Sequence, residues 1–422
     1  MNKALFDFIG RCPTAYHTAA AAAEKLSAVG FVELCESAAW TLEAGKGYFV
    51  RRGSSSLIAF RAPRDFSGFV IAAAHGDSPA LKLREGTTVG GGYTQLSVEP
   101  YGGMIFSSWF DRPLSVAGRV VIKTAEGVAT RLVDFGEPVA VIPNVAIHMN
   151  RAVNDGVKLN AAVDLPPLFG DGEAKSLGAR VAERLGVSED EILSSDLFVY
   201  NPQPGVEWNG YISAPRLDDL QCVFAALTAF LDAEKGGSAK VFALFDNEEV
   251  GSRTRQGAAS TFLFDVLRRV SAAYGCDFDT RLAGSLMLSC DNVHAVHPNH
   301  PELADKTCAA RMNGGVVIKY NANQQYATDA LSAGLFKLIC TRAGVPYQSY
   351  ANRADMPGGS TLGNISNAQV SLCTVDIGLA QLAMHSSFET AGAADTEYLF
   401  RALKAAFETT FSSPRDGEIN VE

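Results

Sequence analysis

Residues 239–252 read AKVFALFDNEEVGS, a hydrophobic strand that runs directly into a group of acidic side chains. The part up to Phe245 is rich in apolar and aromatic residues, which is typical of a strand buried on both faces of a sheet. Asp246, Glu248 and Glu249 follow at its carboxyl end. Because burying these acids unpaired would be very costly, the pattern predicts either a functional site at a sheet edge or a solvated turn before a helix.

Strands and helices alternate on both sides of these residues. Residues 68–75, GFVIAAAH, form a second short apolar run of the kind expected for a buried strand. An N-terminal amphipathic helix over residues 3–34, broken near Pro13, precedes it. Further segments with helix or strand patterns are LQCVFAALTAFLDAE (220–234), STFLFDVLRRVSAAYG (260–275), AGSLMLSCDN (283–292), TDALSAGLFKLICTRAG (328–344), QVSLCTVDIG (369–378) and TEYLFRALKAAFETTF (396–411). The alternation predicts an α/β fold with a mixed, largely parallel sheet flanked by helices.

The character of the sequence changes between residues 85 and 212. Glycines and prolines punctuate short strands there, and GRVVIKTAEGVATRLVDF (118–135) predicts a hairpin. One helix is expected near SEDEIL (188–193), because its first and fourth residues have capping-box spacing. At 422 residues the chain is longer than one ordinary core requires. We therefore expect an α/β domain, made of residues 1–84 and 213–422, that is interrupted by a β-rich module at 85–212.

Composition and charge exclude several classes of protein. Apolar residues make up 47% of the chain and the formal net charge is −10, with no basic run for binding phosphates, so nucleic acid is not expected as a partner. No stretch reaches the roughly 18 apolar residues that would span a membrane, and the N-terminal residues lack the apolar segment of a signal peptide. The eight cysteines are scattered singly, which favours reduced thiols and a cytoplasmic location.

The predicted strand at 68–75 ends in His75, and Asp77 follows two residues later. Alternation along a strand puts both side chains on the same side, at the edge where open α/β sheets bind ligands. A metal-bound imidazole usually donates its second N–H to a carboxylate, a role that suits Asp77. The same pair also fits a capped turn at the end of a strand.

Polar residues with metal-binding chemistry lie at the ends of other predicted elements. Asp291 follows a strand, and Asp218 with Asp219 precedes a helix, where this pair could simply cap the helix. His385 follows an apolar stretch and could be a packed core residue. The histidines after Asp291, of which one or two are expected to be functional, are His294, His297 and His300. Each residue has a structural explanation, but their joint occurrence at element ends of one α/β region predicts a common site.

Carboxylates and imidazoles together suit Zn²⁺, Mn²⁺ or Co²⁺ rather than an ion that prefers thiolates. Three carboxylates and a bridging hydroxide balance the charge of two divalent ions, so a pair of ions is expected. Such a pair acidifies water and stabilises the oxyanion that forms when this water attacks a carbonyl. Of Glu248 and Glu249, one would bind metal and the other would act as general base, and the residue pattern alone leaves the assignment open.

Several sequence blocks taken together resemble the aspartyl aminopeptidase family of dinuclear zinc exopeptidases. In order they are HGDSP (75–79), SWFDRPLSVAGRV (108–120), PNVAIHMNR (143–151), RLDDL (216–220), FDNEEVGS (245–252), CDNVHAVHP (290–298), GVVIKYNANQQYATD (315–329) and QLAMHS (381–386). The resemblance covers nearly the whole chain. It implies a zinc exopeptidase-like fold whose inserted module, residues 85–212, is the dimerisation domain of a tetrahedral dodecamer built from dimers.

The resemblance also implies roles for individual residues. Glu248 matches the general base and Asp77 the supporting carboxylate. Asp218 matches the residue that bridges two zinc ions. The full set of residues that match metal ligands is His75, Asp218, Glu249, Asp291 and His385.

On the substrate side, His148 matches a histidine that reaches the active site of a neighbouring subunit. The other substrate-side matches are His294, Lys319 and Tyr326. Lys319 could attract an acidic N-terminal side chain, although it could also be an ordinary solvated lysine of an alternating strand. Two positions depart from the family pattern, because Gly76 replaces a threonine and Asp219 replaces an asparagine.

The expected function is hydrolysis of the N-terminal residue, with Asp or Glu preferred, from peptides that have a free N-terminus. The expected cofactors are two divalent ions, zinc first and manganese or cobalt as alternatives. A dinuclear amidohydrolase acting on small N-acyl amino acids is a second interpretation. A catalytically silent peptide-binding shell is a third, but every expected ligand and the base are present in the sequence, which argues against it.

Overall fold

The computed structural model describes residues 1–422, apart from the side chain of Val89, and its chain divides into two compact units. The first unit comprises Met1–Asp77, Gly205–Met384 and Glu389–Glu422, and the second comprises Ser78–Pro204 and His385–Phe388. The second unit begins at Ser78 and the first resumes at Gly205, so both boundaries fall earlier in the chain than the expected boundaries at 85 and 213. The reason is that one strand of the second unit already begins at Ala80, and a strand of the first unit begins at Val206.

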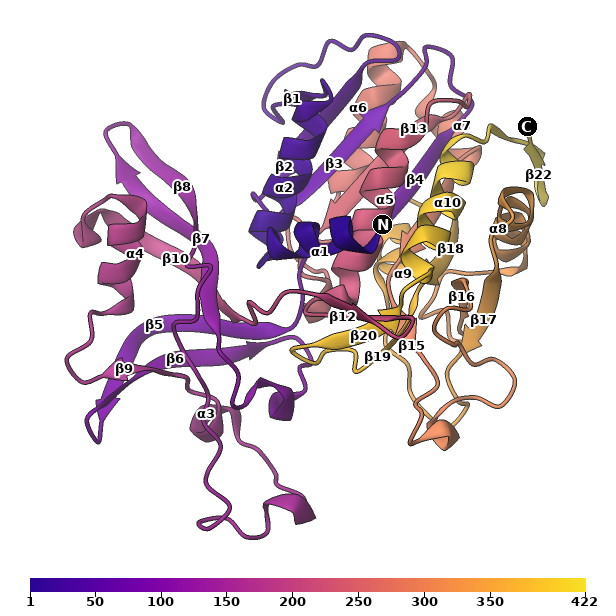
Figure 1. Cartoon of the computed structure of the whole chain (residues 1–422). Coiled ribbons are helices and arrows are strands. Elements are labelled where there is room, and N and C mark those ends of the chain that lie inside the picture. Colours follow the sequence, from indigo (N-terminus) through magenta and orange to yellow (C-terminus); the bar gives the residue numbers. More distant parts are fainter. The chain divides into compact units, whose positions relative to one another are not determined.

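A nine-stranded mixed sheet forms the centre of the first unit (Figure 1). Its strands, in spatial order, are β1 (Val32–Leu34), β2 (Gly47–Arg52), β3 (Ser56–Arg61), β13 (Ala239–Phe245), β4 (Phe69–His75), β14 (Leu286–Cys290), β18 (Cys373–Gly378), β16 (Val316–Tyr320) and β17 (Tyr347–Ala351). The four central strands β13, β4, β14 and β18 run parallel to one another. The expected mixed, largely parallel α/β architecture is confirmed.

Helices cover both faces of this sheet, and each face has its own hydrophobic core (Figure 1). The first core receives apolar side chains from α1 (Asn2–Gly10), α2 (Ala15–Ala28), α5 (Leu217–Asp232), α8 (Ala330–Ala343) and α10 (Asp395–Phe407). The second receives them from α6 (Phe262–Tyr274), α7 (Phe278–Ala283) and α9 (Leu362–Asn367). The N-terminal helix is broken around Pro13, as its sequence predicted, but it ends at Ala28, and residues 32–34, which were expected to be helical, form the strand β1.

Two smaller sheets complete the first unit. The strands of a five-stranded sheet, in spatial order, are β11 (Val206–Trp208), β12 (Tyr211–Ala214), β20 (Glu389–Gly392), β19 (Ala380–Leu382) and β15 (Val293–His294). A hairpin near the C-terminus consists of β21 (Phe411–Arg415) and β22 (Glu418–Val421). In this sheet β11 pairs with β12 and β19 with β20 as local hairpins, whereas β12 with β20 and β15 with β19 pair across large sequence separations.

The second unit is built on a six-stranded antiparallel sheet with its own core. Its strands, in spatial order, are β8 (Gly127–Asp134), β7 (Ser115–Thr124), β10 (Ile192–Tyr200), β5 (Ala80–Gly90), β6 (Tyr93–Tyr101) and β9 (Leu168–Asp171). The hairpin expected at 118–135 is confirmed as β7 and β8. The unit also contains α3 (Ala161–Asp164) and α4 (Leu177–Leu185).

The helix expected near SEDEIL was wrong. The capping box of Ser188 and Glu191 is present, but it closes a single 3-10 turn, Glu189–Glu191, which leads directly into β10. The helix of this region is α4, whose first turn is capped by the Ser176 hydroxyl accepting a hydrogen bond from the Ala179 N–H. Other 3-10 turns are η1 (Phe106–Trp109), η2 (Val153–Asp155), η4 (Glu248–Val250) and η5 (Pro301–Leu303).

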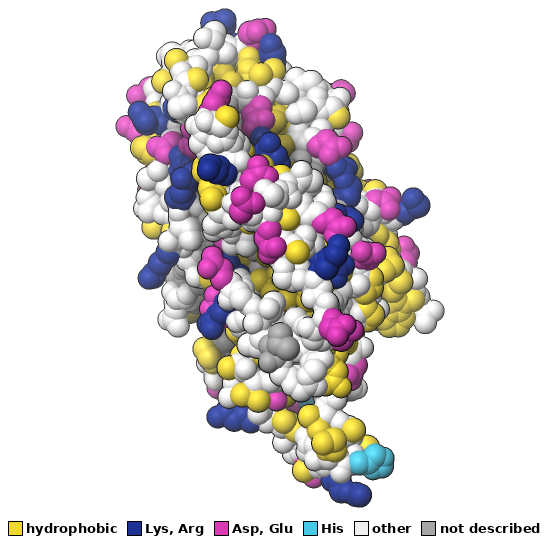
Figure 2. Space-filling model, turned by 90° about the vertical axis from the view of Figure 1, so that its left-hand side faces the viewer, with side chains coloured by type: hydrophobic (Ala, Val, Ile, Leu, Met, Phe, Trp, Pro, Cys, Tyr) yellow, Lys and Arg dark blue, Asp and Glu magenta, His cyan; other side chains and the backbone are white. Residues whose placement is uncertain are grey.

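Basic and acidic side chains are interspersed on the molecular face that Figure 2 displays. No broad basic patch of the kind that binds nucleic acid is visible on that face, in keeping with the net charge of −10. None of the helices in the described chain combines the length and hydrophobicity that crossing a membrane requires.

Candidate metal centre

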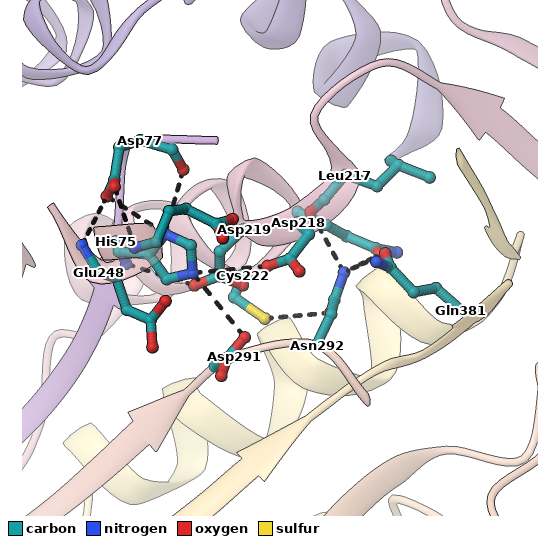
Figure 3. A network of polar contacts seen from close by, with 12 residues as sticks. His75, Asp77, Leu217, Asp218, Asp219, Cys222, Glu248, Asp291, Asn292 and Gln381 are labelled. Carbon is teal, nitrogen blue, oxygen red and sulfur yellow. Dashed lines mark hydrogen bonds and ion pairs between the residues drawn. The ribbon is translucent and has the colours of Figure 1, made fainter. Parts of the chain in front are cut away.

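The register of the central sheet brings the polar residues of distant segments to one edge. Phe245, the last residue of β13, pairs with His75, the last residue of β4, so the acids that follow β13 lie beside His75. β14 runs parallel to β4 on its other side and ends immediately before Asp291. The beginning of α5 supplies Asp218 and Asp219 to the same place (Figure 3).

His75 and Asp218 form the centre of this cluster and are almost completely buried. His75 Nε2 lies 3.4 Å from Asp218 Oδ1 and 3.8 Å from Asp291 Oδ1. Potential ligand atoms of His75, Asp218 and Glu249 all lie within 4.8 Å of one another. The same holds for Asp218, Asp219 and Asp291. Asp218 therefore belongs to two adjoining groups of potential metal ligands.

The electrostatics of the cluster favour a bound cation. Burial, reinforced by Asp218, raises the pKa of Glu249 well above its usual range. Burial also raises the pKa of Asp219, and the neighbouring Asp291 adds to this effect although His75 opposes it. These carboxylates are concentrated where water is excluded, so a divalent ion would relieve their repulsion. The mixture of imidazole and carboxylate donors fits zinc.

Asp77 connects His75 to the two glutamates. The Nδ1 atom of His75 lies 3.1 Å from the Asp77 carbonyl oxygen and 3.4 Å from its Oδ1. The carboxylate oxygens of Asp77 accept hydrogen bonds of 3.2 Å from the backbone N–H groups of Glu248 and Glu249. One side chain thus fixes the 3-10 turn η4 relative to His75.

Glu248 has the electrostatic character of a proton acceptor. Burial raises the pKa of its carboxyl to about 8, an effect that His75 opposes and Asp291 reinforces. A bound cation nearby would favour the ionised form and bring this pKa down. A carboxylate whose proton affinity is set in this way suits general acid–base catalysis.

Lys319 is buried rather than solvated, so the interpretation as an ordinary exposed strand lysine was wrong. It lies on β16, where Val316 to Lys319 are all buried because the strand is covered on both faces. Its Nζ donates hydrogen bonds to Asp291 Oδ2 at 3.1 Å and to the Asp291 carbonyl oxygen at 2.9 Å. Although burial opposes ionisation, Lys319 holds the pKa of Asp291 below its usual range.

Replacing Lys319 with methionine should destabilise the metal-free protein, because Asp291 would be left as a buried charge without its main cation. The expected loss in the free energy of unfolding is about 3 kcal/mol, and added zinc should restore part of it. Denaturant unfolding with and without zinc measures both effects. Lys337→Met is the matched control, since Lys337 lies on α8 over the Tyr320 ring, away from any carboxylate described at the site. Equal losses in the two variants would contradict the pairing argument.

Of the predicted substrate-side residues of the first unit, His294 lines a cavity of about 350 Å³, whereas Lys319 and Tyr326 are not among its lining residues. His294 and His297 line it together with Tyr350. His300 does not line it and instead places its Nδ1 3.2 Å from Glu302 Oε1 at the surface. The ring of the largely buried Tyr326 lies 5.0 Å from Lys319 Nζ.

Two residues predicted for the site belong to the second unit. The Nδ1 atom of His385 lies 2.8 Å from the Gly103 carbonyl oxygen, and the backbone of His385 has a positive φ of 68°. His148 is exposed and follows β8 in the chain. The other predicted ligands, the supporting acid and Glu248 all come from the first unit.

Asn292 and Asp376 were missed by sequence reasoning. The Asn292 amide donates to the Leu217 carbonyl oxygen at 3.2 Å and to Gln381 Oε1 at 2.9 Å, which ties the end of β14 to the start of α5. Asp376 is completely buried in β18, and this burial raises its pKa to about 6 although Lys319 opposes the shift. The signal for Asp376 was present as a single acid within the apolar run CTVDIG.

The presence of glycine at position 76, where the family pattern has threonine, has a steric explanation. A Cβ atom at this position would lie 3.1 Å from Leu244 Cδ1 and 3.1 Å from Thr18 Cγ2. This spacing is tight, so a threonine here would require these neighbours to move. Glycine therefore fits the packing of this chain.

Comparisons with known proteins agree with the geometry. A family model described as aminopeptidase I zinc metalloprotease (M18) matches residues 8–407. A probable M18 family aminopeptidase 2 from Pseudomonas paraeruginosa is 42% identical over 424 residues, which cover 97% of this chain and 98% of the relative. The solved complex of Ape4 and Nbr1 matches with a TM-score of 0.91 and 33% identity, covering 96% of this chain and 84% of that chain. The solved S. cerevisiae mApe1 dodecamer matches with a TM-score of 0.85 and 29% identity, covering 96% of this chain and 96% of that chain.

Proposed function

This chain belongs to the M18 family of zinc metalloproteases, and from that premise we propose that it removes N-terminal Asp or Glu residues from peptides at a pair of zinc ions. Aminopeptidase activity follows from the family. The acidic preference and the number and identity of the ions are the proposed parts. The observation that carries the proposal is the cluster of the buried His75 and Asp218 with the partly buried Glu249 and Asp291, in which Asp218 belongs to both groups of ligand atoms.

His75, Asp218 and Glu249 would hold one ion, and Asp218 and Asp291 would contribute to the other. His385 is the remaining proposed ligand. The contact of its Nδ1 with the Gly103 carbonyl supports this role, because a metal-bound imidazole usually donates its other N–H to such an oxygen. When bound, the ions would acidify a water molecule and polarise the scissile carbonyl.

The protein's own groups would handle the protons. The Glu248 carboxylate would take a proton from the attacking water and return it to the leaving amine. Asp77 would act as a positioning residue, because its carboxylate holds the backbone amides of Glu248 and Glu249. This arrangement keeps one glutamate on the metal while the other remains available to the substrate.

The acidic preference is proposed to depend on Lys319, with His294, Tyr326 and His148 as further substrate residues. Lys319 Nζ already donates to Asp291, so a substrate carboxylate would share this ammonium group with Asp291. The pairing keeps the lysine charged although it is buried, which supports a role in attracting an anionic side chain.

A panel of aminoacyl substrates tests the proposal. After chelation, activity should disappear, and zinc, manganese or cobalt should restore it. The restored enzyme should have a kcat/KM at least about tenfold higher for aspartyl and glutamyl substrates than for leucyl ones, a difference of about 1.4 kcal/mol in transition-state binding. Hydrolysis of an N-acetyl amino acid in preference to the free-amine substrates would instead favour an amidohydrolase. Failure of every metal to restore activity would refute the mechanism.

We also propose that the chain forms a homo-oligomer, a tetrahedral dodecamer built from dimers through the inserted module. The similar mApe1 of S. cerevisiae forms a dodecamer, which supports this proposal. In the second unit, exposed apolar side chains that an assembly could cover are Val145, Ile147, Met149 and Val163. A monomeric mass in light scattering would contradict the proposal.

The eight cysteines, all free thiols, support a reducing, cytoplasmic compartment.

A further inference from the structure

Asp376 is a completely buried acid of β18 that lies outside the two groups of potential metal ligands. β18 runs between β14 and β16 in the central sheet. Asp376 pairs with Ser289 of β14 on one side. On the other side Ile377 pairs with Ile318 of β16, so continuing this register by one residue places Asp376 opposite Lys319. The acid therefore lies beside the lysine that is proposed to attract the acidic substrate side chain.

Asp376 is hydrogen-bonded to the segment that carries Tyr326. Its Oδ2 accepts a 2.5 Å hydrogen bond from the Ala327 backbone N–H, and its own backbone N–H donates to the Thr328 hydroxyl at 2.9 Å. Both partners follow Tyr326 directly, in the connection between β16 and α8. The largely buried Tyr326 places its ring 5.0 Å from the Nζ of Lys319. One residue of the sheet thus holds the backbone from which the tyrosine ring reaches the lysine.

The packing around Asp376 leaves its carboxyl group little freedom to turn away from this segment. A Cβ atom at Gly363, in the first turn of α9, would lie 2.4 Å from Asp376 Oδ1 and 2.8 Å from Ser289 Oγ. The start of α9 therefore closes over both side chains, an approach that any side chain at position 363 would hinder. Because a buried acid is costly unless its oxygens are hydrogen-bonded, this enclosure favours the contact with Ala327.

We propose that Asp376 is a positioning residue that supports the acidic preference by holding Tyr326 beside Lys319. The tyrosine ring and the ammonium group would together receive the carboxylate of an N-terminal Asp or Glu. Asp376 is completely buried, so it would act through Tyr326 rather than touch the substrate. Loss of its contact with Ala327 should let the ring move and weaken the binding of an acidic side chain, while Glu248 keeps its place. The inference rests on the acidic preference of the proposed function.

Kinetics of Asp376→Ala and Asp376→Asn with aspartyl and leucyl substrates test the proposal. Alanine removes the acceptor, so KM for the aspartyl substrate should rise about tenfold, while KM for the leucyl substrate and both kcat values change less than about threefold. Asparagine keeps an oxygen that can accept the Ala327 N–H, so Asp376→Asn should recover most of the wild-type KM. A residue with a structural role alone would lower activity toward both substrates alike. Elemental analysis checks that the metal content is unchanged.

Asp395→Ala is the matched control. Asp395 is also completely buried, and its carboxylate accepts hydrogen bonds from the backbone N–H groups of Asn313 at 2.6 Å and Gly315 at 3.1 Å, just before β16 begins. It thus anchors the backbone at the other end of the same strand. This variant should unfold at a lower denaturant concentration but keep the wild-type ratio of kcat/KM between the two substrates.

An unchanged KM for the aspartyl substrate in Asp376→Ala would overturn the assignment, as would an equal loss for both substrates. A wild-type enzyme without a preference for aspartyl over leucyl substrates would instead refute the proposed function itself, so the two failures can be told apart. If Asp376→Ala does not fold, Thr328→Val replaces it, because valine removes the hydroxyl that accepts the Asp376 N–H. The KM ratio between the two substrates should then shift about threefold, and an unchanged ratio would overturn the proposal.

Discussion

Replacing Glu248 with glutamine should lower kcat by about 10²–10⁴-fold while both metal ions remain bound. Glutamine has nearly the same shape as glutamate, but it cannot take a proton from the attacking water. The contact that fixes this residue is made by its backbone N–H, which donates to Asp77 Oδ1 at 3.2 Å and is unchanged in the variant. The metal ligands should therefore keep their positions, and the loss should appear in kcat rather than in metal content.

Steady-state kinetics combined with elemental analysis separates these quantities. Glu302→Gln is the matched control, because Glu302 is an exposed glutamate beside His300 at the surface. This control should keep wild-type kcat. Near-full activity of Glu248→Gln with metals bound would show that another group moves the proton, and Glu249 would then have to be reconsidered as the base.

Replacing Asp218 with asparagine should remove both metal ions and reduce activity to background. Asp218 is the one residue that belongs to both groups of ligand atoms described for the site. Its backbone N–H donates to Glu389 Oε2 at 3.0 Å, so the main chain should keep its place when the side chain changes. Glu249→Gln, by contrast, removes a ligand from one group and should cost the protein mainly one ion.

The number of ions per chain after dialysis against zinc distinguishes these outcomes. Asp232→Asn, at the other end of the same helix α5, is the control, because Asp232 is exposed and pairs with Lys404. It should retain the wild-type metal content. Two tightly held ions in Asp218→Asn would show that the two groups of ligands do not share this residue.

Elements that depend on interactions between residues close in sequence were predicted more accurately than elements that depend on residues far apart in sequence. The buried strands β4 and β13 and the helix α5 were predictable because their apolar patterns are local. The hairpin of β7 and β8 was predictable for the same reason, since its strands are joined by a short turn. The helix predicted near SEDEIL was wrong because a capping box marks where a helical turn begins but does not determine whether the helix continues beyond that turn.

The domain boundaries depended on contacts that are distant in sequence. β12 pairs with β20, so residues shortly before the expected boundary at 213 belong to the first unit. His385, far along the chain, belongs to the second unit. Pairing between strands of such large separation is decided by packing and loop closure, which leave no periodic signal in either segment.

For the candidate site, the sequence by itself determined the kinds of donor and the elements that carry them. Carboxylates and imidazoles follow hydrophobic runs, and both features are local. The tertiary structure decided which donors meet, because the order β13, β4, β14 is not the order of the chain. It also decided that Lys319 is buried against Asp291 and that Asp219 is completely buried beside the backbone of His75. Burial and charge compensation are properties of the packed molecule, so no stretch of sequence contains them alone.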